Sequence, residues 1–169
     1  MNATAYWLMK SEPAMFSIED LQQQGKTSWE GVRNYQARNF LRDDLKVGDG
    51  VLFYHSSCAP PGVAGLARVS RAGFPDPTAF DPKSLYFDAK SRLSTPVWIT
   101  VEVEFVARFA RLVTLDELRG IGDLSGMLVL KRGVRLSVQP VTQREYTIIK
   151  KLGLETSLAG DPSPSSRRR

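Results

Sequence analysis

Four short segments of the sequence carry more polar and aromatic side chains than a protein core or an ordinary surface requires. They are Trp7–Pro13, Trp29–Asn39, Phe53–Ser56 and Arg135–Pro140. Three of them lie where a predicted strand ends, and the second leads into a predicted helix. Strand ends and helix starts are the places where a rigid scaffold presents side chains to a ligand. These four segments are therefore the candidate functional site.

The second segment has the side chains that a nucleic-acid site needs. Trp29 and Tyr35 offer flat faces on which a base can stack, and the amide of Asn34 can pair with a base edge. Arg33 and Arg38 can hold phosphates, and the first helical turn adds outward-pointing N–H groups. The alternative interpretation places the two aromatic rings in the core and uses the amides as helix caps. The density of these residue types together favours the nucleic-acid interpretation.

Three predicted helix starts share one signature, a hydroxyl residue followed three positions later by an acid. At this spacing the two side chains satisfy each other's exposed backbone amides, and an apolar residue on either side of each pair adds a hydrophobic contact. The pairs are Ser17 with Asp20, Thr114 with Glu117 and Thr142 with Glu145. The last of these helices is predicted over 143–151, and a fourth helix is predicted over 36–43.

Strands account for most of the remaining chain. Apolar and polar residues alternate over 97–105, and two β-rich runs flank a Cys-Ala-Pro-Pro-Gly turn, which predicts a hairpin. Residues 74–96, rich in Pro, Asp and Ser, predict a long surface excursion with one helical turn. Short strands interrupted by capped helices favour an α+β fold with a small curved sheet or barrel. The predicted strands are 6–9, 50–55, 63–69, 97–105 and 135–138.

The net charge of +5 is unevenly distributed, because the last residues carry three arginines and one aspartate. Without that tail the charge is +3, which by itself does not indicate a nucleic-acid partner. The tail, residues 156–169, is rich in Pro and Ser and is predicted to be disordered. It is interpreted as a solubilising end, with a nonspecific phosphate contact as the alternative.

Composition also excludes several classes of protein. A single cysteine, Cys58, rules out an internal disulfide, and with only one histidine, His55, there are too few ligands for a zinc site. No apolar run approaches the ~18 residues that cross a bilayer, and the N-terminus lacks the basic region of a signal peptide. We expect a soluble monomer without cofactor, metal or membrane contact, cytoplasmic in a bacterial cell and nuclear in a eukaryotic one.

Five blocks of the sequence, in this order, resemble the EVE-domain family. They are Tyr-Trp-Leu-Met-Lys-Ser-Glu-Pro at 6–13, Trp-Glu-Gly-Val-Arg-Asn-Tyr-Gln-Ala-Arg-Asn at 29–39, Phe-Tyr-His-Ser at 53–56, Asp-Pro-Thr-Ala-Phe-Asp-Pro at 76–82 and Ser-Val-Gln-Pro-Val at 137–141. The resemblance covers about 5–153, which predicts one domain over 1–155 followed by the tail. It implies a small PUA-like β-barrel with flanking helices, and a pocket for a modified nucleobase, of DNA or RNA, taken out of the stack.

The residue types suit such a pocket, because an aromatic face supplies stacking and polar side chains read the base edge. Stacking is assigned to Trp29 and Tyr35. The base edge is assigned to Asn34, Ser11, Ser56 and Ser137, with His55 as a further lining residue. The backbone phosphates are assigned to Lys10, Arg33 and Arg38.

Hydrolysis of a modified nucleoside is the alternative function. Lys10, Ser11 and Glu12 bring together an amine, a hydroxyl and a carboxylate, and the ASCH relatives of the family include an amidohydrolase that acts on a modified cytidine. Successive strand residues point to opposite faces, so Ser11 is expected to face away from the other two. A docking module for another protein is a third interpretation, but the segments are too polar for a hydrophobic patch. We expect a binding module rather than an enzyme, with no catalytic residues.

Overall fold

The structure is a computed structural model that describes residues 4–155. The predicted disordered tail lies outside the described residues. The helices are α1 (Ile18–Gln24), α2 (Tyr35–Asn39), α3 (Leu115–Arg119) and α4 (Gln143–Leu154). The strands are β1 (Tyr6–Ser11), β2 (Lys26–Ser28), β3 (Gly50–His55), β4 (Gly62–Pro75), β5 (Ile99–Thr114) and β6 (Val138–Val141). Within residues 4–155, no helix combines the length and the apolar character that a membrane span requires.

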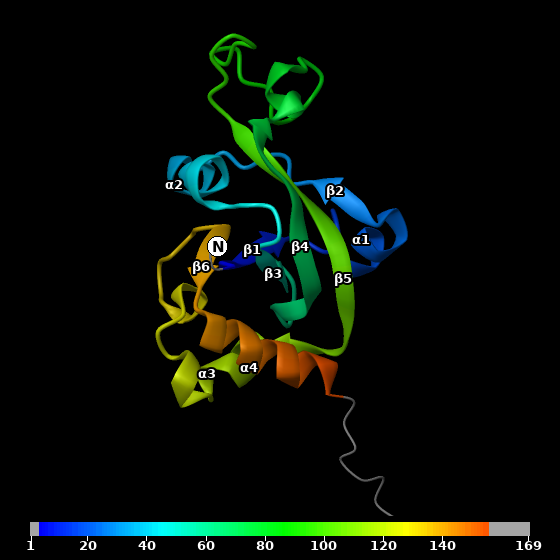
Figure 1. Cartoon of the computed structure of the whole chain (residues 1–169), viewed down its shortest axis with the longest axis vertical. Coiled ribbons are helices and arrows are strands. Elements are labelled where there is room, and N and C mark those ends of the chain that lie inside the picture. The colour runs from blue at the N-terminus through cyan, green and yellow to red at the C-terminus, as the bar shows by residue number, and fades with distance from the viewer. Residues whose placement is uncertain (1–3, 156–169) are drawn as a thin grey trace, which may run out of the picture.

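The described strands form one mixed sheet in the order β2-β5-β4-β3-β1-β6. β1 runs parallel to β3, and the other neighbours are antiparallel. The α+β class is therefore confirmed. A closed barrel is not, because β2 and β6 have no hydrogen-bonded partner on their outer sides among the described strands. The long strands β4 and β5 curve instead (Figure 1), and repeated bulges shift their register along the way.

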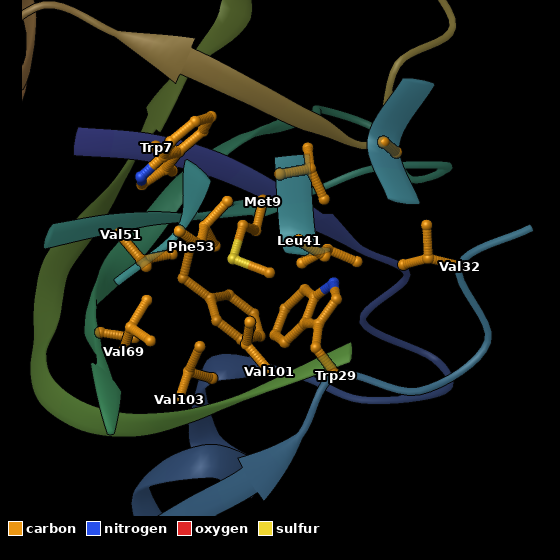
Figure 2. Packing of buried hydrophobic residues seen from close by; sticks show 14 of the residues in the cluster. Trp7, Met9, Trp29, Val32, Leu41, Val51, Phe53, Val69, Val101 and Val103 are labelled. Carbon is orange, nitrogen blue, oxygen red and sulfur yellow. The ribbon is translucent and has the colours of Figure 1, made fainter. Parts of the chain in front are cut away.

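Both faces of the sheet are buried, and the alternation along β1 shows how. Trp7 and Met9 enter one apolar cluster, whereas Leu8 enters the other. In β3 Phe53 follows the first pattern, and its ring packs among Met9 and Trp29 in Figure 2. Helix α4 packs across β4 and β5 on the second face. The sheet is thus a rigid platform from which strand ends can present polar groups.

Two of the three predicted capping boxes form with both reciprocal hydrogen bonds, those of Ser17 and Thr142. Thr114 also caps its helix by accepting a hydrogen bond from the Glu117 amide. The Glu117 carboxylate does not return the bond, because it pairs with Arg111 of β5 at 2.6 and 2.8 Å. In this third capping box, an ion pair with Arg111 of the preceding strand therefore replaces the hydrogen bond that Glu117 was expected to accept.

Several predicted elements have different bounds from those expected, and β1, β4, β5 and α4 all extend beyond their predicted ends. The strand predicted over 135–138 is wrong in position, since β6 begins at Val138 and runs through Pro140 to Val141. A proline is tolerated there because β6 lies at the edge of the sheet. The helix predicted over 36–43 begins one residue earlier and continues after Asn39 as a wider π-helical turn.

The predicted excursion is a projection that we call the arm, residues 76–98, between β4 and β5. Figure 1 shows it extending beyond the end of the sheet, on the side where α2 lies. It contains one 3₁₀ turn, Pro77–Phe80, as expected. Trp98 secures its base, because the indole N–H donates to Asp88 at 2.8 Å and the ring stacks on Tyr35. The arm is therefore attached to the body through the buried side chain of Trp98.

Candidate functional site

A cleft of about 570 Å³ opens where β1 ends, between the segment that follows β2 and the arm. This volume lies within the roughly 300–1,000 Å³ of small-ligand pockets. Five predicted site residues line the cleft: Lys10, Ser11, Trp29, Arg33 and Ser137. The other lining residues are Glu12, Met15, Phe16, Thr27, Ser28, Glu30, Gly31, Val32 and Tyr86. Side chains from four distant parts of the sequence thus meet at one place.

The end of β1 brings three consecutive polar residues into the cleft. Lys10, Ser11 and Glu12 all line it, which corrects the expectation that Ser11 faces away. The reason is that strand geometry stops at Ser11, and the chain then turns so that the Phe16 amide donates to the Glu12 carbonyl at 2.8 Å. The Ser11 hydroxyl donates to the Phe16 carbonyl at 2.5 Å. Ser137 arrives from the other side, where its carbonyl accepts from the Lys10 amide at 2.9 Å.

The charges that line the cleft balance. Lys10 and Arg33 carry positive charge, and Glu12 and Glu30 carry negative charge. Burial lowers the pKa of Lys10 below its ordinary value. Burial, and then the nearby charge of Asp76, raise the pKa of Glu30. A cleft with donors and acceptors but little net charge suits a neutral polar ligand better than an anion.

Trp29 belongs to both the core and the cleft. Its side chain is in the first apolar cluster with only 8% exposed, and its ring meets Phe53 edge-on with centroids 5.4 Å apart (Figure 2). Its carbonyl accepts a hydrogen bond from the Thr100 hydroxyl. Only a small part of the indole can therefore reach a ligand, and stacking by its full face would require the core to open.

Tyr86 is an aromatic lining residue that the sequence analysis did not identify. It comes from the arm, and 40% of the residue is exposed. Its ring packs closely over Gly31, where an added Cβ would lie 2.6 Å from the ring. Gly31 also has φ of +86°, a conformation that favours glycine. No periodicity or motif in a Pro- and Asp-rich segment points to such a contact.

Arg33 fastens the arm to the cleft with every donor that it has. A guanidinium has five N–H groups, and those of Arg33 bond to the Val32 carbonyl, to Asp76, to Thr78 and twice to the Tyr86 carbonyl, at 2.6–3.2 Å. A phosphate contact, as predicted for this residue, would have to displace one of these bonds. The structure therefore gives Arg33 a role as the anchor of Tyr86.

Asp76 is the buried centre of this anchor, with 1% of the residue exposed. Besides Arg33 it accepts hydrogen bonds from the Gly31 amide at 2.9 Å and from the amide and hydroxyl of Thr78. Burial alone would raise the pKa of Asp76, but the bonds from Thr78, Gly31 and Arg33 outweigh it and hold the pKa below its ordinary value. Asp76 thus stays ionised and binds both sides of the cleft rim together.

Three predicted site residues lie outside the cleft: Tyr35 and Arg38 on α2, and Asn34 directly before it. The Asn34 side chain caps this helix by accepting from the Ala37 amide at 2.9 Å. The Tyr35 ring lies between Trp98, stacked at 5.0 Å, and the guanidinium of Arg38 at 5.1 Å. Arg38 also donates to the Val97 carbonyl at 2.7 Å. The capping and packing alternative therefore accounts for Asn34 and Tyr35, and base contacts by them stay predictions.

The two predicted residues at the end of β3, His55 within the strand and Ser56 directly after it, do not line the cleft either. The Nε2 atom of His55 accepts a hydrogen bond from the amide of Ile18, the first residue of α1, at 3.1 Å. Burial lowers the pKa of His55, against an opposing effect of Glu19. The Ser56 amide donates to the Ser11 carbonyl at 2.9 Å, so this segment supports the cleft from behind.

Comparison with known proteins identifies the family. The EVE domain matches residues 5–152. The chain belongs to the EVE-domain family. Human thymocyte nuclear protein 1 is 42% identical, and the match covers 89% of this chain and 75% of that protein.

Several solved structures share the fold. A protein from Pseudomonas putida is 51% identical with a TM-score of 0.85, and the match covers 89% of this chain and 100% of that one. The human THYN1 protein, solved in complex with DNA containing 5-methylcytosine, is 40% identical with a TM-score of 0.82 over 90% of this chain and 99% of that one. A YTH domain from Zygosaccharomyces rouxii, 14% identical with a TM-score of 0.53, shows the same fold only.

A second, smaller groove of about 350 Å³ adjoins the cleft of this EVE domain. Its lining residues are Asn34, Gln36, Leu128, Gly133, Val134, Arg135 and Leu136. Two pairs of consecutive residues, Arg33 with Asn34 and Leu136 with Ser137, connect it to the cleft. The groove contains one cation and no carboxylate. Its electrostatic character is therefore opposite to the balanced character of the cleft.

Proposed function

We propose that this EVE domain binds a strand of nucleic acid and holds one modified base of it in the cleft. The observation that carries the proposal is a charge-balanced polar cleft with an exposed aromatic ring, Tyr86, fixed at its rim. A base is a neutral, flat ligand with donors and acceptors on its edge, which is what such a cleft accommodates. The human relative crystallised with DNA containing 5-methylcytosine supports the same ligand class.

The lining residues offer a complement to each part of a methylated cytosine. The ring of Tyr86 provides a stacking surface. The carboxylates of Glu12 and Glu30 can accept from the exocyclic amino group, as acidic side chains do with cytosine. Lys10 and Ser137 can contact the opposite edge, and Met15, Phe16 and Val32 provide apolar surface for a methyl group.

The phosphates of the same strand must lie outside the balanced cleft. We infer that they follow the second groove, where Arg135 has no carboxylate beside it and Asn34 has used its oxygen as a cap. Removing a base from its stack costs a few kcal/mol, and an aromatic contact returns roughly 1–3 kcal/mol. Phosphate contacts then supply affinity that does not depend on the base.

The test is a fluorescence-anisotropy titration of a labelled single strand carrying one central 5-methylcytosine, against the same strand with cytosine. The parent protein should bind the methylated strand more tightly. Tyr86→Ala should weaken that binding by about 5- to 150-fold, the loss of one stacking contact. Phe87→Ala, a neighbouring arm residue that is 43% exposed and does not line the cleft, should bind like the parent. Equal affinity for both strands, or an unaffected Tyr86→Ala, would overturn the proposal.

Hydrolysis is an outcome of a parallel test. Lys10, Ser11 and Glu12 share the cleft, but the Ser11 hydroxyl donates to a backbone carbonyl and Lys10 lies 5.9 Å from the Tyr54 ring centroid. After incubation with N4-acetylcytidine or 5-methylcytidine, mass spectrometry should find the nucleoside unchanged. Turnover that disappears in Lys10→Ala would replace binding by catalysis as the function of this cleft.

A further inference from the structure

The residue next to Tyr86, Leu85, is a leucine that is almost fully exposed to solvent. Leu85 lies on the arm and is 93% exposed, more than any other large hydrophobic residue described. Tyr86 lines the cleft, and Leu85 precedes it directly. The arm itself projects beyond the sheet in Figure 1. An apolar side chain therefore stands in water immediately beside the proposed base site.

A hydrogen-bonded turn holds Leu85 in this position. The Ser84 amide donates to the Asp81 carbonyl at 2.9 Å, and the Tyr86 amide donates to the Ser84 hydroxyl at 3.1 Å. On the other side, two hydrogen bonds from Arg33, at 2.6 and 3.1 Å, hold the Tyr86 carbonyl. These hydrogen bonds fix the backbone before and after Leu85. The exposure of its side chain therefore follows from a defined backbone conformation.

The charged side chains of the arm leave its cations available to a polyanion. Lys83, Lys90 and Arg92 form no ion pair with any described residue. The carboxylates of Asp81 and Asp88 are instead used within the arm, where they accept from backbone amides and from the Trp98 indole. The surroundings of Leu85 therefore suit contact with phosphates on either side of an apolar insertion.

We propose that Leu85 is a wedge that enters the base stack of a duplex where the base bound in the cleft has been extruded. This inference rests on the proposed function and adds double-stranded substrate to it. A leucine inserted between base steps replaces the lost stacking partner and keeps the extruded base from returning. The adjacent Tyr86 then contacts the extruded base, because consecutive Cα atoms are only about 3.8 Å apart.

The experiment compares Leu85→Ala with Leu93→Ala, a matched control that is 80% exposed on the same arm without a neighbour in the cleft. Each variant and the parent are titrated with a duplex carrying one 5-methylcytosine and with its methylated strand alone. Leu85→Ala should weaken duplex binding by about 10-fold or more and leave single-strand binding unchanged, since a single strand has no stack to invade. Leu93→Ala should match the parent on both.

A second readout follows the stack itself. A 2-aminopurine next to the methylated base brightens when it loses its stacking neighbour, and the parent should brighten it in the duplex more than Leu85→Ala does. Equal duplex affinity and equal brightening for parent and Leu85→Ala, or equal losses on duplex and single strand, would overturn the wedge. If the parent bound the methylated and the unmethylated single strand equally in the titration described for the proposed function, the base-binding proposal would be overturned instead. The two failures are therefore separable.

Discussion

Arg33 has no N–H donor left for a ligand, because five hydrogen bonds join it to the cleft rim and to the arm. A residue in this situation affects binding through position and not through contact. Its ion pair with the buried Asp76, at 2.9 Å, is also costly to break from one side. We therefore expect Arg33 to affect binding by holding Tyr86 in place and not by contacting the ligand.

Arg33→Gln tests this distinction. We expect a loss of about 3–5 kcal/mol in unfolding free energy, measured by urea denaturation, because Asp76 is left buried without its cation. Affinity for the methylated strand should fall, but the dependence of log Kd on log salt should keep its slope. In Arg135→Gln, which loses a cation of the second groove, the slope should decrease by about one with little change in stability. A decreased slope in Arg33→Gln would restore the phosphate contact.

His55 predicts a pH dependence of stability near neutrality. Its pKa is lowered from 6.5 by burial, so the folded protein binds fewer protons there than the unfolded chain. The stabilisation is fully present above 6.5 and is lost as pH falls toward the lower folded value, where protonation removes the acceptor of the Ile18 amide. The urea concentration at the unfolding midpoint should therefore decrease as the pH is lowered from about 8 to 5.

The matched variant is His55→Gln, which keeps an acceptor near Ile18 but does not titrate. Because His55 is the only histidine of the sequence, this variant should lose most of the decrease in urea midpoint over that pH range. An undiminished decrease would assign the effect to other groups.

The arm and the segment after β2 pack closely against each other and form the rim of the cleft. Gly31 lets the Tyr86 ring approach within a distance that a Cβ would forbid. Stacking of Arg38 on Tyr35, and of Tyr35 on Trp98, likewise fixes the base of the arm by close packing. The rim is therefore preorganised, which reduces the entropy cost of the base binding proposed above.

Two glycine variants separate the rim from simple backbone strain. Gly31 and Gly48 both have positive φ, +86° and +94°, so alanine at either position should lower unfolding free energy by about 1–3 kcal/mol. Only Gly31→Ala meets the Tyr86 ring, whereas a Cβ at Gly48 has nothing within 4 Å. Calorimetry should find both variants folded with melting temperatures below that of the parent, but binding of the methylated strand should weaken for Gly31→Ala alone. Equal affinities would show that the position of Tyr86 is unimportant.

In the function proposed above, base recognition and general affinity belong to different regions of the molecule. The cleft is balanced in charge, the second groove has one cation without a carboxylate, and the tail adds three arginines and one aspartate outside the described residues. Charges that do not face a base contribute to every sequence alike.

Deletion of residues 161–169 tests this division. Affinity for methylated and unmethylated strands should fall by the same factor, and the salt slope should fall by as much as about 0.7–0.9 for each arginine removed. The ratio of the two affinities should be unchanged, as measured by anisotropy at several salt concentrations. A ratio that falls to one would place discrimination in the tail and not in the cleft.

The sequence alone determined the features that depend on neighbouring residues. The capping boxes of Ser17 and Thr142 formed because both partners lie three residues apart, and the helix and strand patterns placed most elements. The polar ends of β1 and of the segment after β2 also reached the cleft, since strand ends must be exposed somewhere. Such features follow from local geometry, which the order of residues specifies directly.

Which distant side chains meet depends on the tertiary structure and could not be predicted from the sequence. Tyr86 enters the cleft 53 residues from its anchor Arg33, and His55 accepts from Ile18 at a separation of 37 residues. The tertiary structure also decided that Trp29 serves the core, and that the sheet of described strands stays open at β2 and β6. These outcomes depend on how β4 and β5 curve and where the arm folds back. That path is set by the packing of the whole chain, and no local pattern around any one of these residues contains it.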